Sequence, residues 1–120
     1  MKIAITAKSD KLSGEVDPRF GRAAYFIIFN TADDSFEAIS NGSNARAAQG
    51  AGIQAAQTVA KKEVEWVISG NMGPKAFASL KAAGIKIASV ESGTIEQVIK
   101  LARESKLQEI QSANVEEHWR

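Results

Sequence analysis

The change in hydrophobic period at about residue 50 constrains the fold of this chain most. Before it, the apolar residues follow strand patterns over residues 2–7, 25–29 and 35–40. After it, helical spacing over residues 53–62, 74–84 and 94–102 alternates with short apolar runs at 66–68 and 85–90. The order β-β-β-α-β-α-β-α therefore predicts a first strand, a hairpin, and then alternating helices and strands.

The connections between these elements predict the sheet. A strand–helix–strand unit makes its two strands parallel, with a right-handed crossover. With strand 2–7 in the middle, the hairpin lies on one side and the two later strands on the other. We therefore expect an α/β fold with a central five-stranded mixed sheet in the order 3-2-1-4-5, flanked by three helices. The 120 residues suit one domain, which we assign to residues 1–112, with 113–120 as a flexible C-terminal tail.

This topology gathers four loops at one edge of the sheet. The loop Val16–Ala23 follows the first strand. Each of the three glycine-bearing turns lies between a later strand and the helix that comes after it; they are at 50–52, 69–74 and 92–94. Ligands of open α/β sheets bind at the carboxyl ends of strands, and helix N-termini there attract anions. The residues predicted to bind an anionic cofactor at this edge are Arg19, Phe20, Gly21, Arg22, Gly50, Gly52, Gly70, Asn71, Gly73, Gly93 and Thr94.

Each of these features also has a structural explanation. Asp17-Pro18 could be a rigid turn, and Arg22 could pair with a nearby carboxylate. The ring of Phe20 is better explained as a core residue than as a ligand contact. A single glycine turn is more often structural than functional. The functional prediction therefore rests on the convergence of the four loops.

The composition excludes several classes of protein. The chain has 15 Lys and Arg residues against 14 Asp and Glu, a net charge of +1, which argues against a general nucleic-acid binder. It has no cysteine, which excludes disulfides and thiolate-bound metal centres, and a single histidine, His118. The start of the chain resembles a strand and not a signal peptide, and no apolar run approaches the length of a membrane span. We expect a soluble cytoplasmic protein.

The sequence favours no catalytic residues. The spacing of a dinucleotide fingerprint and the Gly-Lys-Ser/Thr of a phosphate loop are both absent. A ribonuclease-H-like nuclease would need clustered carboxylates that hold two metal ions, but residues 2–7 contain no acidic side chain. We therefore predict a protein that is not an enzyme, with a metal-dependent nuclease as the weakest alternative.

Several motifs together resemble the dinitrogenase iron–molybdenum cofactor biosynthesis family. They are Asp-Pro-Arg-Phe-Gly-Arg-Ala at 17–23, Gly-Ala-Gly-Ile-Gln at 50–54, Ser-Gly-Asn-Met-Gly-Pro-Lys-Ala-Phe at 69–77, Ala-Gly-Ile-Lys at 83–86 and Asn-Val-Glu-Glu-His-Trp at 114–119. The resemblance implies a ribonuclease-H-like fold and a carrier of iron–sulfur or iron–molybdenum cofactor precursors. One branch, the orange protein, carries a molybdenum–copper sulfide cluster without covalent attachment. The resemblance also implies a possible P-loop ATPase or cofactor-biosynthesis partner, so a regulatory or scaffold role is the main alternative.

The chain departs from the family pattern at Arg19, where many members have a histidine. The loss of this potential metal ligand, together with the absence of cysteine, favours capture of an anionic metal–sulfide cluster by charge. We predict that backbone N–H groups of Gly52, Gly73 and Thr94 bind it together with Arg19 and Arg22. Such charge-assisted bonds contribute roughly 1.5–3 kcal/mol each. His118 is a weak candidate metal ligand and otherwise a solvated tail residue.

Overall fold

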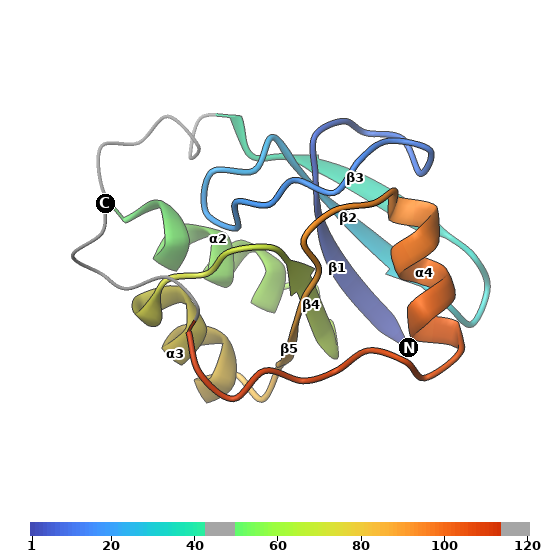
Figure 1. Cartoon of the computed structure of the whole chain (residues 1–120). Helices are drawn as coiled ribbons and strands as arrows, with labels where there is room; N and C mark the ends of the chain where they lie inside the picture. Colours follow the sequence, from blue (N-terminus) through green and yellow to red (C-terminus); the bar gives the residue numbers. More distant parts are fainter. Residues whose placement is uncertain (43–49, 114–120) are drawn as a thin grey trace.

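The computed structural model describes residues 1–42 and 50–113, which form a five-stranded sheet between two layers of helices (Figure 1). The strand order is β3-β2-β1-β4-β5. Helices α2 (Ala51–Ala60) and α3 (Pro74–Ala82) cover one face, and α4 (Ile95–Arg103) covers the other. The predicted fold class, strand order and helix number are therefore confirmed for the described residues.

The sheet is mixed, as the connections predicted. Strand β1 (Lys2–Ala7) pairs antiparallel with β2 (Tyr25–Asn30), which pairs antiparallel with β3 (Phe36–Ser40). On its other side, β1 is parallel to β4 (Trp66–Ser69), and β4 is parallel to β5 (Lys86–Ser89). The carboxyl ends of β1, β4 and β5 consequently lie at the same edge.

The two faces of the sheet bury separate cores because side chains alternate along each strand. On β1, Ile3 and Ile5 pack toward α4 with Ile27, Ile68 and Ile95. Ala4 packs on the opposite face, together with residues from α2, α3 and the neighbouring strands: Phe26, Ala55, Val59, Val67 and Leu80. The sheet is thus covered on both sides, which explains why β1, β2 and β4 are apolar along nearly their whole length.

The helix ends follow the predicted local chemistry. Helix α3 ends in a Schellman motif, in which the Gly84 N–H donates to the Lys81 carbonyl and the Ile85 N–H to the Leu80 carbonyl. Gly84 has φ 78°, a conformation that glycine adopts without strain. Helix α4 begins with a capping box: the Gln97 N–H donates to Thr94 Oγ1, and the Thr94 N–H donates to Gln97 Oε1.

We expect Thr94→Ala to lower the free energy of unfolding by about 1 kcal/mol, the usual contribution of an N-cap side chain. The substitution removes the acceptor of the Gln97 N–H. Urea unfolding should show this loss, whereas Ser92→Ala, an exposed position two residues earlier, should change the midpoint little. Equal effects of the two substitutions would contradict the capping role.

Two segments whose sequences have no helix or strand pattern are nevertheless ordered by backbone pairing. Residues 8–15, a polar stretch, turn back on β1, because the Lys8 N–H donates to the Glu15 carbonyl and Ala7 pairs with Val16. After α4, where the periodic pattern fades, the Ile110 N–H donates to the Ile87 carbonyl. This last segment lies along the outer edge of β5. In both cases backbone pairing with a distant strand, which leaves no local pattern, orders the segment.

Candidate functional site

Three hydroxyl side chains lie at or next to the carboxyl ends of the parallel strands and hold the loops above them. Thr6 Oγ1 donates to the Asp17 carbonyl at 2.6 Å, and Ser69 Oγ lies 3.1 Å from Thr6 Oγ1. Ser89 Oγ donates to the Gly70 carbonyl at 2.8 Å. Thr6 and Ser69 are buried. The hydroxyls therefore act as internal supports of the site, a role for which the sequence alone carried no distinctive signal.

The loop Val16–Ala23, which we call the arginine loop, pairs with the 69–74 turn. The Asn71 N–H donates to the Pro18 carbonyl, and the Phe20 N–H donates to the Asn71 carbonyl at 3.1 Å. Gly70 lies directly beneath this contact: a Cβ there would be 2.7 Å from Pro18 Cα and 2.8 Å from its carbonyl oxygen. The absence of a side chain at Gly70 lets the two loops extend the parallel pairing of β1 and β4 beyond the sheet.

The same loop also lies against the first turn of α2. A Cβ on Gly21 would be 2.7 Å from the Gly52 nitrogen, so only glycine permits this approach. The buried side chain of Asn41 holds the loop in place, since its Nδ2 donates to the carbonyls of Gly21 (3.1 Å) and Ala23 (2.9 Å). Asn41 is a supporting residue that sequence reasoning missed, because asparagine after a strand is ordinary turn chemistry.

The third glycine turn meets the beginning of the loop. The Val16 N–H donates to the carbonyl of Gly93, which has φ 123°. The N–H groups of Ile95 and Glu96 donate to the carbonyls of Gly14 and Leu12. With Thr94 and Gln97 engaged in the capping box, the donors of the first turn of α4 are all used within the chain. The Thr94 N–H, which we expected to contact an anion, donates in this structure to Gln97 Oε1.

Helices α2 and α3 begin differently. Their N-cap residues, Gly50 and Gly73, have no side chain for a capping bond, and neither first turn contains an acidic residue. The two first turns are in contact: a Cβ on Gly52 would be 3.2 Å from Ala76 Cβ. Pro74, as predicted, begins α3. Two positive ends of helix dipoles thus lie side by side beneath the arginine loop.

The positive charge of Arg19 is paired with the carboxylate of Asp17 within the same loop. Its Nε donates to Asp17 Oδ1 at 3.1 Å and its terminal NH2 group to Asp17 Oδ2 at 3.0 Å, while its backbone N–H also donates to Oδ1 at 3.0 Å. The Asp17 side chain is 1% exposed and that of Arg19 62%. The hydrogen bond and charge of Asp17 raise the pKa of Arg19 above its ordinary value. Arg19 thus forms a structural ion pair of the kind that the sequence suggested for Arg22.

The remaining predicted residues divide between core and surface. The Phe20 ring is buried, with its centroid 5.7 Å from that of Phe26, so it supports the loop from below and does not face the edge. Arg22, Gly50 and Asn71 are exposed at the edge, as is Lys75 in the first turn of α3. His118 lies outside the described residues.

In the part of the chain that the structure describes, the side chains that usually coordinate metals do not gather at this edge. Among residues 1–42 and 50–113, no group of three or more His, Cys, Asp or Glu side chains could hold a metal ion. Direct coordination of a metal by such a group does not fit the described edge, nor does the carboxylate cluster of a two-metal nuclease. Donors of hydrogen bonds and positive charge are the chemistry that the edge offers.

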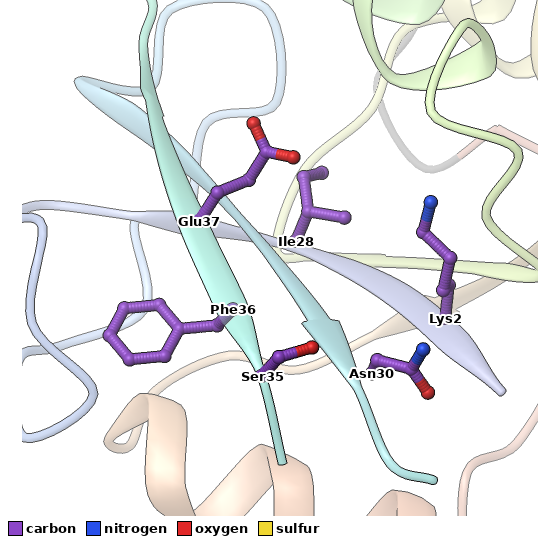
Figure 2. A pocket seen from close by; sticks show the side chains of 6 residues that line it. All are labelled: Lys2, Ile28, Asn30, Ser35, Phe36 and Glu37. Carbon is purple, nitrogen blue, oxygen red and sulfur yellow. The ribbon is translucent and has the colours of Figure 1, made fainter. Parts of the chain in front are cut away.

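A surface hollow of about 250 Å³ lies elsewhere, over β1, β2 and β3. Lys2, Ile28 and Glu37 line it, and Figure 2 shows Phe36 pointing away from Ile28 and Glu37. Phe36 is 44% exposed because β3 is the edge strand of the sheet. The hollow includes none of the predicted site residues.

No helix in the described part of the chain is long and apolar enough to cross a membrane.

Comparison with known proteins places this arrangement in a family. The chain is 39% identical to the apo form of the orange protein from Desulfovibrio gigas, with a TM-score of 0.91 over 95% of this chain and 96% of that one. It is 36% identical to a putative NifB protein from Thermotoga, with a TM-score of 0.80 over 95% and 98% of the two chains. An uncharacterised protein of Methanocaldococcus jannaschii is 32% identical over 92% of both chains.

The sequence itself matches the family described as "Dinitrogenase iron-molybdenum cofactor" over residues 1–105. This range includes the arginine loop, all three glycine turns and the beginnings of α2 and α3 that meet them. The chain therefore belongs to the dinitrogenase iron–molybdenum cofactor family.

Proposed function

We propose that this protein is a non-catalytic carrier of an anionic metal–sulfide cluster, of the molybdenum–copper or iron–molybdenum type. The observation that carries the proposal is the contact between the first turns of α2 and α3 beneath the arginine loop. Neither first turn contains an acidic residue, both N-cap residues are glycines, and Arg22 and Lys75 are exposed beside them. Membership of the family supports a role in binding or carrying a metal cofactor.

The chemistry of the edge suits a sulfide-rich cargo. The chain has no thiolate to compete for the metal, so the cluster would keep its own sulfide ligands. The N–H groups of Gly52 and Gly73, with the Arg22 guanidinium, would donate to its outer sulfur atoms. A few charge-assisted bonds, offset by the cost of association, give micromolar binding, which is about −8 kcal/mol. Such binding is reversible, as a carrier requires.

The proposal predicts that the pure protein retains colour after it is mixed with tetrathiomolybdate and copper. The charge-transfer absorption of the cluster should co-elute with the protein in gel filtration, with molybdenum and copper in fixed proportion. Arg22→Gln should weaken retention about tenfold, since one charge-assisted hydrogen bond contributes at least about 1.5 kcal/mol.

Arg103→Gln provides the matched control. Arg103 lies at the end of α4, pairs with Asp34 in the hairpin turn and stacks over Phe29, at the opposite edge of the sheet. It carries the same charge as Arg22, and its substitution should leave retention unchanged. No retained colour in the wild type, or equal losses in the two variants, would contradict the proposed cargo or its place.

The family resemblance implies an alternative function, a scaffold that binds a protein partner such as a P-loop ATPase. We also propose that the protein is located in the cytoplasm. A carrier and a scaffold differ in what copurifies with them. Metal and sulfide analysis of protein purified without air from its native host would support the carrier, whereas a stoichiometric partner without metal would support the scaffold. Repeating the copurification with a chain that ends at Ser112 tests whether the tail contributes.

A further inference from the structure

We propose that Asp17 makes the carboxyl edge selective against compact oxyanions such as phosphate and molybdate. This inference rests on the proposed function, because it concerns the selectivity of the same edge. Its basis is the geometry of the Asp17–Arg19 pair: both carboxylate oxygens accept from the Arg19 side chain, and Oδ1 also accepts from the Arg19 backbone N–H.

Asp17 is fixed before any ligand arrives. Its N–H donates to the Thr6 carbonyl at 2.9 Å, and its own carbonyl accepts from Thr6 Oγ1. Pro18 follows it, so the backbone has little freedom to turn the carboxylate outward. The carboxylate is buried and the guanidinium exposed. The exposed arginine is therefore held by the fixed carboxylate.

This arrangement removes the feature by which arginine recognises oxyanions. Phosphate and sulfate bind arginine best in a bidentate manner, with two parallel N–H···O bonds. In this loop Nε and the terminal NH2 group already make that interaction with Asp17. An oxyanion that took the same donors would leave a buried carboxylate without its charged partner, which is strongly unfavourable. The negative charge of Asp17 would also repel the approaching oxyanion.

A metal–sulfide cluster is affected less. Its charge is spread over several large sulfur atoms. It can accept single hydrogen bonds from backbone N–H groups and from Arg22 without the guanidinium fork of Arg19, that is, the paired Nε and NH2 donors. Asp17 thus disfavours the binding of compact oxyanions more than the binding of the metal–sulfide cluster. Selectivity of this kind, obtained by disfavouring the competitor, is a general means of discrimination.

The test compares molybdate, phosphate and tetrathiomolybdate with copper on the wild type and on Asp17→Asn. The amide keeps the shape of the carboxylate and its acceptor for the Arg19 N–H, but removes the charge and frees the fork. NMR titration should show that Asp17→Asn binds molybdate and phosphate at least tenfold more tightly than the wild type. Binding of the thiomolybdate–copper cluster should change less than about threefold, since its contacts do not require the fork. The double variant Asp17→Asn/Arg19→Gln should return oxyanion binding to the wild-type level.

Three outcomes would overturn this inference: wild-type protein that binds the oxyanions as tightly as Asp17→Asn, a gain that persists in the double variant, or a larger gain for the cluster than for the oxyanions. If Asp17→Asn does not fold, as thermal unfolding would show, Arg19→Lys alone decides, because it keeps a positive charge beside the buried Asp17 carboxylate but removes the bidentate donors. It should leave the weak oxyanion binding of the wild type unchanged, and a clear loss would overturn the proposal. Failure of the wild type to retain the cluster contradicts the carrier function but leaves the oxyanion comparison valid.

Discussion

Replacing Phe20 by alanine should lower the free energy of unfolding by about 3–5 kcal/mol, the usual cost of removing a buried aromatic ring. The ring is 2% exposed and packs with Phe26 in the core beneath α2 and α3. Because Phe20 lies within the arginine loop, the cavity would also loosen the edge above it. Urea unfolding followed by circular dichroism measures the loss of stability, and cluster retention measures the effect on the edge.

Phe36→Ala is the matched control, since it deletes the same ring at a position that is 44% exposed on the edge strand. We expect it to cost about 1 kcal/mol or less and to leave cluster retention unchanged. If Phe20→Ala were no more destabilising than Phe36→Ala, the ring would not support the loop as the structure indicates.

Gly70→Ala should have the second large effect, a loss of roughly 2–4 kcal/mol, combining overpacking with the loss of backbone hydrogen bonds. The new Cβ would lie within 2.9 Å of the Cα, Cβ and carbonyl oxygen of Pro18. To relieve this contact, the arginine loop must lift from the 69–74 turn and break its hydrogen bonds with Asn71. We therefore expect weaker cluster retention together with lower stability, measured on the same preparation.

Gly84→Ala separates this steric effect from a general intolerance of glycine substitution. No atom lies within 4 Å of a Cβ at Gly84, but its φ of 78° disfavours other residues. We expect a loss of about 1–2 kcal/mol from backbone strain alone. Cluster retention should stay at the wild-type level, because Gly84 ends α3 far from its first turn. A Gly70→Ala protein with wild-type stability would show that the two loops are not in the close contact described.

Much of the candidate site could be predicted from sequence because the loops follow from topology. The period of the apolar residues located the strands, and Pro74, Gly84 and Thr94 marked helix ends through local chemistry that acts within a few residues. Strand pairing rules then brought the four loops to one edge. Backbone bonds and close contacts link the arginine loop to the three glycine turns.

The use of individual donors could not be predicted in the same way. Thr94 was expected to offer its N–H to a ligand, yet Gln97 takes it, and the carbonyls of Gly14 and Leu12 take the next two donors of α4. Those two carbonyls belong to a segment about 80 residues earlier in the chain, whose polar composition indicated only a loop. Only the fold brings them to the helix end.

The sequence by itself determined the element order, the sheet topology and the residues that meet at the carboxyl edge, since these follow from local periodicity and chain connectivity. The tertiary structure alone decided which charges and donors at that edge are engaged. It pairs Arg19 with a buried Asp17, closes the end of α4 and brings the ends of α2 and α3 into contact. The reason is physical: a hydrogen bond depends on ångström-scale placement of groups from distant segments, which periodicity does not specify.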